Sequence, residues 1–372
     1  MTDRLKIGFD AKRIVRNGTG LGSYGRTLVN DLASYPLELR LYAPDQGRDH
    51  LRQQIRLQEN VRFCYPAPSH LPFSKALWRS KGIVSDLKRD GIQLFHGLSG
   101  ELPIGIHQSG VKSVVTIHDL IFLRHPEFYH WIDTKIYAWK FRKTIQEADH
   151  IIAISACTKR DIMEYGGVDE SKISLIYQSC APKFTSAPSL RQAQGPLSGR
   201  YILSVGSIEK RKNILLAVKA LPYLPEELKL VIVGRHTPYT DEVKAYAEKA
   251  GLSHRIKIMH GVSDEALPRL YAEAEAFVYP SRYEGFGIPI IEAISCGLPV
   301  VACKGSCLEE AGGPDSLYVD PDDAEAMAHA IRQVLRGAEG REKRIENSQQ
   351  YIKRFAGNDV AGQVVELYRR LL

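Results

Sequence analysis

Two glutamates that flank a glycine-rich turn form the strongest chemical pattern in the sequence. Glu284 and Glu292 enclose the residues Gly-Phe-Gly-Ile-Pro-Ile-Ile, with an apolar stretch on either side. Proline fits the first position of a helix, so Pro289 predicts a helix start with Glu292 in the first turn. Gly285 and Gly287 leave the backbone bare just before this helix, where N–H groups and the helix dipole favour an anion. The pattern predicts a pyrophosphate site between two carboxylates that accept hydrogen bonds from hydroxyl groups.

A basic pair forms the second candidate site. Arg211 and Lys212 follow Gly206 and the apolar run Tyr201–Val205, and the helical segment Ile214–Leu221 comes next. Breaking a bond to a nucleoside diphosphate develops negative charge on the leaving oxygen, which fixed cations and backbone amides stabilise. A solvated basic turn is the alternative interpretation, but the position between a strand and a helix favours a phosphate site.

These residues must be positioned by short apolar runs that alternate with amphipathic, helix-length segments. Several runs are almost continuous Val, Ile and Leu, which is typical of parallel strands covered on both faces. The alternation predicts an α/β fold of doubly wound parallel sheets. The predicted strands are Leu5–Asp10, Glu38–Tyr42, Leu94–His96, Val111–Ile117, His150–Ile154, Lys172–Ile176, Tyr201–Val205, Lys229–Val233, Ile256–Met259, Ala276–Tyr279 and Pro299–Ala302. The predicted helices include Tyr24–Ala33, Asp133–Glu147, Ile214–Leu221, Thr240–Ala250 and Glu265–Ala274.

A segment rich in Pro, Ser, Gly and Gln divides the chain into two similar halves. We predict an N-terminal Rossmann-like domain over residues 1–181, a linker over 182–199 and a C-terminal Rossmann-like domain over 200–355. The final helix, within residues 356–372, is expected to cross back towards the first domain. Ligands of such sheets bind at the carboxyl ends of the strands, so we expect the two domains to face a central cleft.

The composition is that of a globular protein and excludes several classes. Of the 372 residues, 44% are hydrophobic and 25% are charged, which is close to the average. No apolar run is long enough for a transmembrane helix, and the start of the chain lacks a signal-peptide core, so we expect a cytoplasmic location. The formal net charge of +7 is too small for the footprint of a nucleic-acid-binding protein, and we expect no nucleic-acid partner.

No residue pattern predicts a metal site or a disulfide framework. The six cysteines include no C-x-x-C pair, so we expect reduced, mostly buried thiols. Asp320-Pro-Asp322 matches a D-x-D metal motif by its letters, but Asp323 follows at once and the cluster is interpreted as a helix start before Ala324. We expect neither a metal nor a cofactor.

Together these motifs resemble the retaining glycosyltransferases of family 4, which have the GT-B fold. The resemblance covers essentially the whole chain, and its E-x7-E block and Arg-Lys pair are specific. It rests on Glu284 to Glu292, on the phosphate-binding turn Ser204–Asn213, on the base-contacting segment Val262–Tyr271, on the His-containing loop Thr116–Leu120, and on His96–Pro103 and the Gly18–Gly25 loop, which resemble those of bacterial polysaccharide transferases.

The resemblance implies a role for each matching residue. Arg211 and Lys212 would neutralise the donor pyrophosphate, and Glu292 would bind the ribose. The other implied contacts are Glu284 with the amides of Gly285, Phe286, Gly287 and Ile288 for the transferred sugar, Gly206 for the phosphates, Val262 for the base, His118 for the sugar, and Gly20 and Gly22 for the donor phosphate or the acceptor. Many relatives carry an arginine where this chain has Ser207, so the phosphate site has one cation fewer.

The implied activity is transfer of a hexose from a nucleotide-diphosphate sugar to a hydroxyl of a glycan or lipid-linked acceptor in cell-surface polysaccharide synthesis. Retention would follow from a same-face displacement in which the leaving phosphate takes the acceptor's proton, and Glu284 is not assigned the role of a nucleophile. The resemblance to O-antigen and capsule transferases points to GDP-mannose, while a deoxy-sugar nucleotide and a UDP-sugar stay open. Neither the acceptor nor the linkage follows from the sequence.

Two other functions are alternatives. Gly20-Leu-Gly22-Ser-Tyr-Gly25 matches a dinucleotide fingerprint, with Asp45 about twenty residues further on, which would fit an NAD-dependent oxidoreductase. That fingerprint needs its glycines directly after the first strand, whereas residues 11–19 intervene here. The second alternative is a nucleotide-sugar-binding protein without transfer activity, which the presence of Arg211, Lys212, Glu284 and His118 disfavours.

Two segments mix basic and aromatic residues, Phe73–Lys81 and Trp131–Lys143. Such segments can lie on an anionic bilayer, which would suit a lipid-linked acceptor and a peripheral contact with the inner membrane leaflet. The alternative is an ordinary amphipathic helix with its tryptophans in the core and its cations in solvent.

Overall fold

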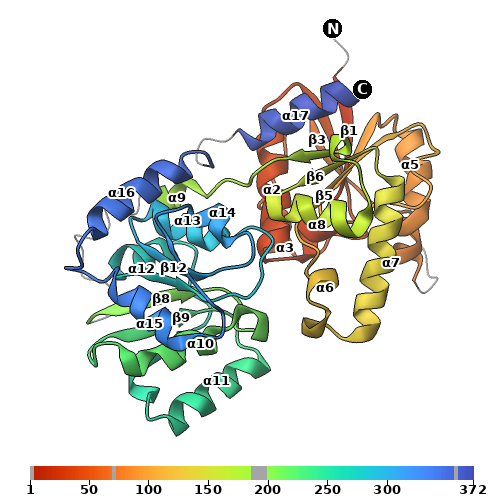
Figure 1. Cartoon of the computed structure of the whole chain (residues 1–372). Coiled ribbons are helices and arrows are strands. Elements are labelled where there is room, and N and C mark those ends of the chain that lie inside the picture. The colour runs from red at the N-terminus through yellow and green to blue at the C-terminus, as the bar shows by residue number, and fades with distance from the viewer. Residues whose placement is uncertain (1–3, 69–72, 186–198, 356–358) are drawn as a thin grey trace. The chain divides into compact units, whose positions relative to one another are not determined.

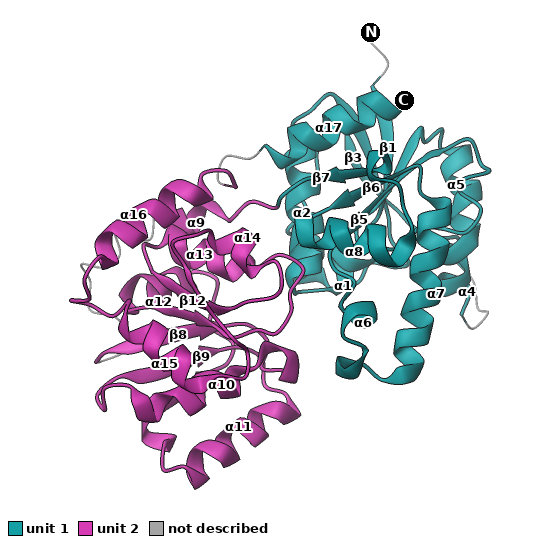
Figure 2. Ribbon diagram, in the orientation of Figure 1, with its two compact units in different colours: residues 1–177, 359–372 teal, residues 178–358 magenta. Residues whose placement is uncertain are grey.

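The computed structural model describes residues 4–68, 73–185, 199–355 and 359–372. It separates into two compact units, one formed by residues 1–177 and 359–372 and the other by residues 178–358 (Figure 2). Each unit is built on its own parallel sheet with helices packed against it (Figure 1). The predicted α/β fold of two doubly wound domains is confirmed.

The sheet of unit 1 has seven strands in the order β3-β2-β1-β4-β5-β6-β7. The order reverses between β1 and β4, which creates the switch point where open α/β sheets bind ligands. Its strands are β1 (Leu5–Asp10), β2 (Leu37–Tyr42), β3 (Val61–Cys64), β4 (Leu94–Gly97), β5 (Lys112–Ile117), β6 (His150–Ala153) and β7 (Ile173–Leu175). Its main helices are α1 (Lys12–Arg16), α2 (Gly20–Leu32), α3 (Asp49–Arg52), α4 (Ser74–Leu77), α5 (Ile83–Arg89), α6 (Ile121–Arg124), α7 (Trp131–Glu147), α8 (Ala156–Gly166) and α17 (Val360–Leu371), and a π-helical turn (Trp78–Gly82) links α4 to α5.

The last helix of the chain belongs to unit 1. In Figure 1 the blue helix α17 lies beside the red helix α2, although the two come from opposite ends of the chain. Val364, Val365 and Tyr368 of α17 are buried in the same core as Ile7 and Leu28. Burial of this apolar face, rather than any local signal, holds the C-terminal segment on the first sheet.

The sheet of unit 2 has six strands in the order β10-β9-β8-β11-β12-β13. Its strands are β8 (Tyr201–Val205), β9 (Lys229–Val233), β10 (Ile256–Met259), β11 (Phe277–Tyr279), β12 (Val300–Cys303) and β13 (Leu317–Val319). Its helices of four or more residues are α9 (Pro182–Thr185), α10 (Ile214–Ala220), α11 (Pro238–Lys249), α12 (Leu267–Glu273), α13 (Ile288–Ser295), α14 (Leu308–Gly312), α15 (Ala324–Arg332) and α16 (Arg341–Ile352). The reversal here lies between β8 and β11, so the segments that follow these two strands meet at one edge of the sheet.

The sequence patterns located the interior strands and the edge strands β7 and β10 to within one or two residues but missed β3 and β13. Both lie at an edge of their sheet, and β13 has only three residues. Arg62 lies exposed in the middle of β3. Edge strands are short and half solvated, so they lack the continuous apolar run that marks a buried parallel strand.

The expectation of a loop over Gly18–Gly25 is wrong. Residues 12–16 form α1 and α2 begins at Gly20, so only a short connection remains. Gly22 lies inside α2, where an added Cβ would come within 1.9 Å of the carbonyl oxygen of Asn17. Gly22 is therefore required by close packing, whereas a Cβ at Gly20 would meet nothing within 4 Å.

The boundary regions differ from the predicted linker. Unit 2 begins at residue 178, and residues 182–185 form α9, which packs on α13. Phe184 of α9 is buried and contacts Tyr271. The remainder of the predicted linker, residues 186–198, lies outside the described residues. No helix in the described part of the chain is long and apolar enough to cross a membrane.

Candidate functional site

The turn after β8 positions the basic pair. Gly206 has φ +148°, a value that side-chain-bearing residues rarely adopt. A single helical turn, Lys210–Lys212, follows, and Asn213 then takes up a left-handed conformation at φ +53° before α10 begins. Asparagine tolerates this region better than most residues. The two reversals turn Arg211 and Lys212 inward, where each side chain is largely buried.

Arg211 and Lys212 both bind Glu284. The guanidinium Nη1 of Arg211 lies 2.9 Å from Oε2 of Glu284, and Nζ of Lys212 lies 2.5 Å from Oε1. The hydroxyl of Ser281 also donates to Oε1. Burial by itself would raise the pKa of Glu284, but Lys212 and Arg211 outweigh it and lower the pKa to about 2. Glu284 is therefore an ionised, fully engaged carboxylate at neutral pH.

Tyr279 joins this cluster and was missed by the sequence analysis. Its hydroxyl accepts a hydrogen bond from Nζ of Lys212 at 2.8 Å and donates to Oε1 of Glu284 at 3.3 Å. Tyr279 is the last residue of β11, and in an apolar run it has the pattern of a core residue. Its place at the carboxyl end of a strand beside the switch point was the available signal. A small pocket beside the cluster is lined by Gly206, Ser207, Lys212 and Tyr279, among others.

The glycine-rich turn leads into α13 as predicted, with Pro289 in its first turn. Gly287 precedes the helix with φ +110°, and a Cβ there would lie 3.2 Å from Leu308 and 3.3 Å from Ala311. Only glycine fits both the backbone angle and the space. Close packing against α14 therefore fixes the turn.

Phe286 and Cys307 attach the same turn to the core of unit 2. The Phe286 side chain is buried and packs edge-on against Phe355, with ring centroids 5.3 Å apart. The Cys307 thiol donates to the carbonyl oxygens of Glu284 and Phe286 at 3.1 and 2.9 Å. The side chain of Phe286 is thus part of the core, and only its backbone could serve a ligand.

Glu292 lies in the second turn of α13, not the first as predicted, because the helix begins at Ile288. Its Oε2 accepts a hydrogen bond from the hydroxyl of Tyr271 at 3.0 Å. Burial raises the pKa of Glu292 to about 7, against the lowering effect of the Tyr271 hydrogen bond. The two predicted carboxylates therefore differ in character, one held ionised by cations and the other poised to change charge near neutral pH.

Val262 lies in the segment after β10, where it is half-buried. The segments that carry Gly206, Val262 and Glu284 thus follow β8, β10 and β11, all at the carboxyl edge of the sheet of unit 2. Arg211, Lys212 and Glu284 are in direct contact. Glu292 lies within α13, about one helical turn after its first residue, Ile288.

The remaining predicted residues, His118, Gly20 and Gly22, belong to unit 1. His118 follows β5, and its Nε2–H donates to the carbonyl oxygen of Leu98 at 2.9 Å. Burial lowers the pKa of His118 to about 4, so the ring is neutral at pH 7. Tyr24, from the helix that carries both glycines, packs edge-on against this ring with centroids 4.8 Å apart.

A chain of buried polar groups extends from Tyr24 to the C-terminal helix. The hydroxyl of Thr116 lies 3.2 Å from that of Tyr24 and 2.8 Å from Nε2 of His96. Nδ1 of His96 lies 2.6 Å from the hydroxyl of Tyr368 on α17. Burial lowers the pKa of His96 to about 3. The segment containing His96 was noted in the sequence, but its link to the chain terminus follows only from the fold.

The Asp320-Pro-Asp322 cluster is a helix start, as predicted. The side chain of Asp323 accepts a hydrogen bond from the backbone N–H of Ala326 at 2.8 Å and caps α15. Among the described residues, no group of three or more His, Cys, Asp or Glu side chains is arranged to hold a metal ion.

Two family models and several curated proteins match the sequence of this chain. A family model described as Glycosyltransferase Family 4 matches residues 18–180, and one described as Glycosyl transferases group 1 matches residues 188–351. O-antigen chain mannosyltransferase B of Escherichia coli is 29% identical, over 99% of this chain and 100% of that one. O-antigen chain mannosyltransferase RfbU of Salmonella typhimurium is 28% identical, over 60% of this chain and 61% of that one.

Solved structures show the same fold. Sucrose-phosphate synthase from Thermosynechococcus elongatus matches with a TM-score of 0.78 at 20% identity, over 99% of both chains. HepE from Anabaena, solved in complex with UDP, matches with a TM-score of 0.74 at 18% identity, over 99% of this chain and 100% of that one. WaaG, a glycosyltransferase involved in lipopolysaccharide biosynthesis, matches with a TM-score of 0.73 at 17% identity, over 97% and 99%. The chain therefore belongs to the glycosyltransferases of the GT-B fold, with a family 4 domain followed by a group 1 domain.

Proposed function

We propose that this glycosyltransferase moves a hexose, with retention of configuration, from a nucleotide-diphosphate sugar to a hydroxyl of a glycan or lipid-linked acceptor. The observation that carries the proposal is the buried cluster of Arg211, Lys212 and Glu284 beside the start of α13. The mannosyltransferases of O-antigen chains to which the chain is similar support a role in cell-surface polysaccharide synthesis and GDP-mannose as the donor.

The two cations would stabilise the leaving diphosphate. They share one buried carboxylate, Glu284, while the other ion pair of Arg211, to the partly exposed Glu209, is longer at 3.9 Å. The buried part of the cluster therefore keeps a net positive charge that a diphosphate can balance. Ser207 adds no charge, which leaves Arg211, Lys212 and the amides of the turn to carry this role without a metal. Fixed cations in a partly buried site cost little reorganisation when charge develops on the leaving oxygen.

Glu284 is suited to binding the sugar rather than attacking it. Both of its carboxylate oxygens already accept hydrogen bonds or ion pairs, from Lys212 and Arg211 among others. A carboxylate with a pKa of about 2 is a weak base and a weak nucleophile. We therefore propose that the acceptor hydroxyl attacks the face that the diphosphate leaves, and that a phosphate oxygen takes the hydroxyl proton. His118, which is neutral, would contribute a hydrogen bond to the sugar.

The donor is tested by calorimetric titration with GDP, UDP, dTDP and NAD. We expect selective binding of GDP, and loss of that binding in the Lys212→Met variant. Incubation with GDP-mannose and membrane lipid extract should then yield a mannosylated lipid with an α linkage by NMR. Selective binding of UDP or dTDP would show that the donor is a UDP- or dTDP-sugar instead of GDP-mannose. A product with inverted configuration would overturn the retaining mechanism. Nucleotide binding without transfer or donor hydrolysis would favour the non-catalytic alternative.

We also propose a peripheral contact with an anionic membrane through α4, the π-helical turn and α7. Phe73, Trp131 and Trp139 are 86%, 69% and 52% exposed, so these three side chains lie outside the core. Trp78 of the first segment is instead partly buried against the core of unit 1, as the alternative of an ordinary amphipathic helix expects. Lys135 and Lys143 are exposed on the same helix α7. Exposed aromatic and basic side chains together favour an anionic bilayer surface.

A further inference from the structure

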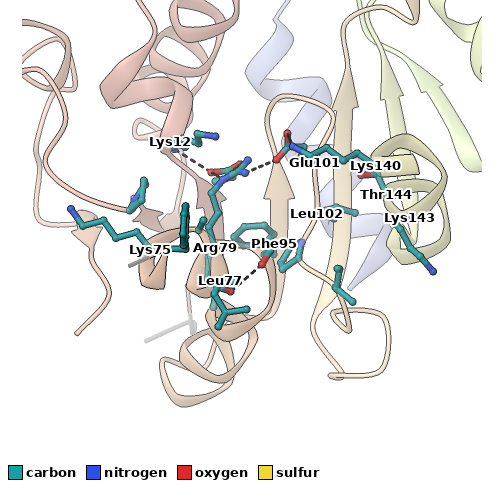
Figure 3. Close-up of a pocket in the computed structure, with 18 of the residues that line it drawn as sticks. Lys12, Lys75, Leu77, Arg79, Phe95, Glu101, Leu102, Lys140, Lys143 and Thr144 are labelled. Carbon is teal, nitrogen blue, oxygen red and sulfur yellow. Dashed lines mark hydrogen bonds and ion pairs between the residues drawn. The ribbon is translucent and has the colours of Figure 1, made fainter. Parts of the chain in front are cut away.

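Unit 1 contains a pocket of about 720 Å³ that includes none of the candidate donor residues (Figure 3). One wall comes from α4 and the π-helical turn, and the opposite wall comes from α7. Asp10 and Phe95 line the pocket from β1 and β4, the neighbouring strands at which the order of the sheet reverses. Both the volume and the position are those of ligand sites in α/β sheets.

An ion-pair network organises the polar side of the pocket. Nε of Arg79 lies 3.1 Å from both carboxylate oxygens of Asp10, and Nη1 of Arg79 is 2.5 Å from Glu101. Nζ of Lys140, from the opposite wall, lies 3.2 Å from the other oxygen of Glu101. Figure 3 shows Arg79 joined to Glu101, with Lys140 alongside. The network holds Arg79 and Lys140 in place, and both carboxylates of the pocket are paired with these two cations.

The pocket keeps an excess of positive charge. Six basic side chains line it against the two acidic ones: Lys12, Arg16, Lys75, Arg79, Lys140 and Lys143 against Asp10 and Glu101. The additional carboxylate of Asp45 pairs with Arg16 and Lys75. The ammonium of Lys12 forms no hydrogen bond or ion pair within the described ranges, and burial, followed by the neighbouring Arg79, lowers its pKa. A partly buried cation that faces a cavity beside another cation is stabilised by an anion.

The outer part of the pocket carries large apolar side chains beside the exposed cations Lys75 and Lys143. Phe73, Leu77 and Trp139 line it and are 86%, 65% and 52% exposed. Leu102 and Ile104 also line the pocket. Cations inside the pocket and large apolar side chains near its opening match an amphiphile that has an anionic head and a hydrocarbon chain.

We propose that this pocket binds one lipid phosphate, with its phosphate at Lys12 and Lys140 and the first part of its hydrocarbon chain against Phe73, Leu77 and Trp139. The inference rests on the proposed function, because such a lipid is the carrier to which the acceptor glycan would be linked. It goes further by assigning recognition of the carrier itself, rather than of the glycan or the bilayer, to a defined cavity.

The test is calorimetric titration of the full chain with monomeric farnesyl diphosphate, farnesol and inorganic diphosphate, without vesicles and with saturating GDP. GDP fills the donor site, so binding that persists occurs elsewhere. We expect farnesyl diphosphate to bind at least tenfold more tightly than either farnesol or inorganic diphosphate. Equal binding of inorganic diphosphate would show a simple anion site and overturn the proposal. Binding of farnesyl diphosphate that is seen only when GDP is left out would also overturn it.

Lys12→Met is the diagnostic variant and Lys112→Met is its matched control. Lys112 is exposed at the start of β5, away from the pocket. We expect Lys12→Met to weaken farnesyl diphosphate at least tenfold and Lys112→Met to leave it unchanged, with GDP affinity and melting temperature preserved in both. Equal affinities for farnesyl diphosphate in the two variants would contradict the pocket assignment. If the chain binds farnesyl diphosphate but no nucleotide, the proposed function fails instead.

Discussion

At the residue scale, Glu284 ties together groups that the sequence presents as separate motifs. Arg211 and Lys212 follow β8, whereas Glu284 follows β11, and the parallel pairing of these neighbouring strands brings the segments together. The motifs identified the residue types, and that they share a diphosphate ligand stays a prediction. The direct pairing, and the part of Tyr279 in it, required the fold.

Replacement of Glu284 should separate catalysis from stability. Glu284→Gln keeps the side-chain volume but loses the charge, and we expect about 100-fold lower kcat/KM for transfer. Glu284→Ala should in addition cost about 3 kcal/mol of unfolding free energy, because it leaves two largely buried cations without their counter-ion. Urea denaturation and initial-rate assays measure both quantities. Glu248→Gln, on an exposed face of α11, is the control, and a Glu284→Gln variant as active as this control would refute the site.

Glu292 should make nucleotide binding depend on pH. Its pKa of about 7, raised by burial, means that the side chain is mostly protonated at pH 6 and mostly ionised at pH 8. The carboxylate accepts hydrogen bonds from ribose hydroxyls more strongly than the neutral acid, so binding favours loss of the proton. We therefore expect affinity for GDP to rise as the pH increases through 7, by at most about tenfold per pH unit.

The nucleotide phosphates also titrate in this range, so Glu292→Gln provides the reference. Calorimetric titrations between pH 6 and 8 should show a smaller rise in affinity for Glu292→Gln than for the native chain. Identical pH profiles for the two proteins would remove Glu292 from the ribose site.

At the scale of elements, α17 contributes a polar contact as well as an apolar face to unit 1. Its Tyr368 hydroxyl reaches the buried His96, which connects through Thr116 to Tyr24 and thus to the surroundings of His118. Buried networks of this kind are costly when one member loses its partner.

Tyr368→Phe should cost about 1–3 kcal/mol of unfolding free energy, because it removes the partner of Nδ1 of buried His96. The matched control is Tyr35→Phe, which removes the hydrogen bond from the partly exposed Tyr35 to Asp359 at the start of the same helix. Water can replace that bond, so the control should cost less than about 1 kcal/mol. Urea denaturation compares the two, and equal losses would show that His96 does not depend on Tyr368.

At the scale of the whole molecule, the exposed aromatic and basic side chains of Phe73, α4 and α7 give unit 1 a chemically distinct surface. The chain should sediment with vesicles that contain phosphatidylglycerol and much less with pure phosphatidylcholine vesicles, because cations near an anionic surface add to apolar insertion. Trp131→Ser should reduce the bound fraction several-fold. Tyr246 of unit 2 is 36% exposed, against 69% for Trp131. Tyr246→Ser should leave the bound fraction unchanged, and equal behaviour of the two variants would contradict the membrane contact.

The α/β fold, most strand positions and the residue types of the candidate donor site were determined by the sequence alone. Continuous apolar runs identify buried parallel strands, and Pro289 with its neighbouring glycines identifies a helix start, because both signals are local. Three features were not predicted: the edge strands β3 and β13 and the start of α2 at Gly20. None of them is marked by a strong local pattern.

Only the tertiary structure decided which distant groups meet. The pairing of Glu284 with Arg211 and Lys212, the link from Tyr368 to His96, and the cationic pocket between α4 and α7 all join segments far apart in the chain. The order of the strands sets these contacts, and that order follows from burial of apolar surface over a whole unit rather than from any short stretch of sequence.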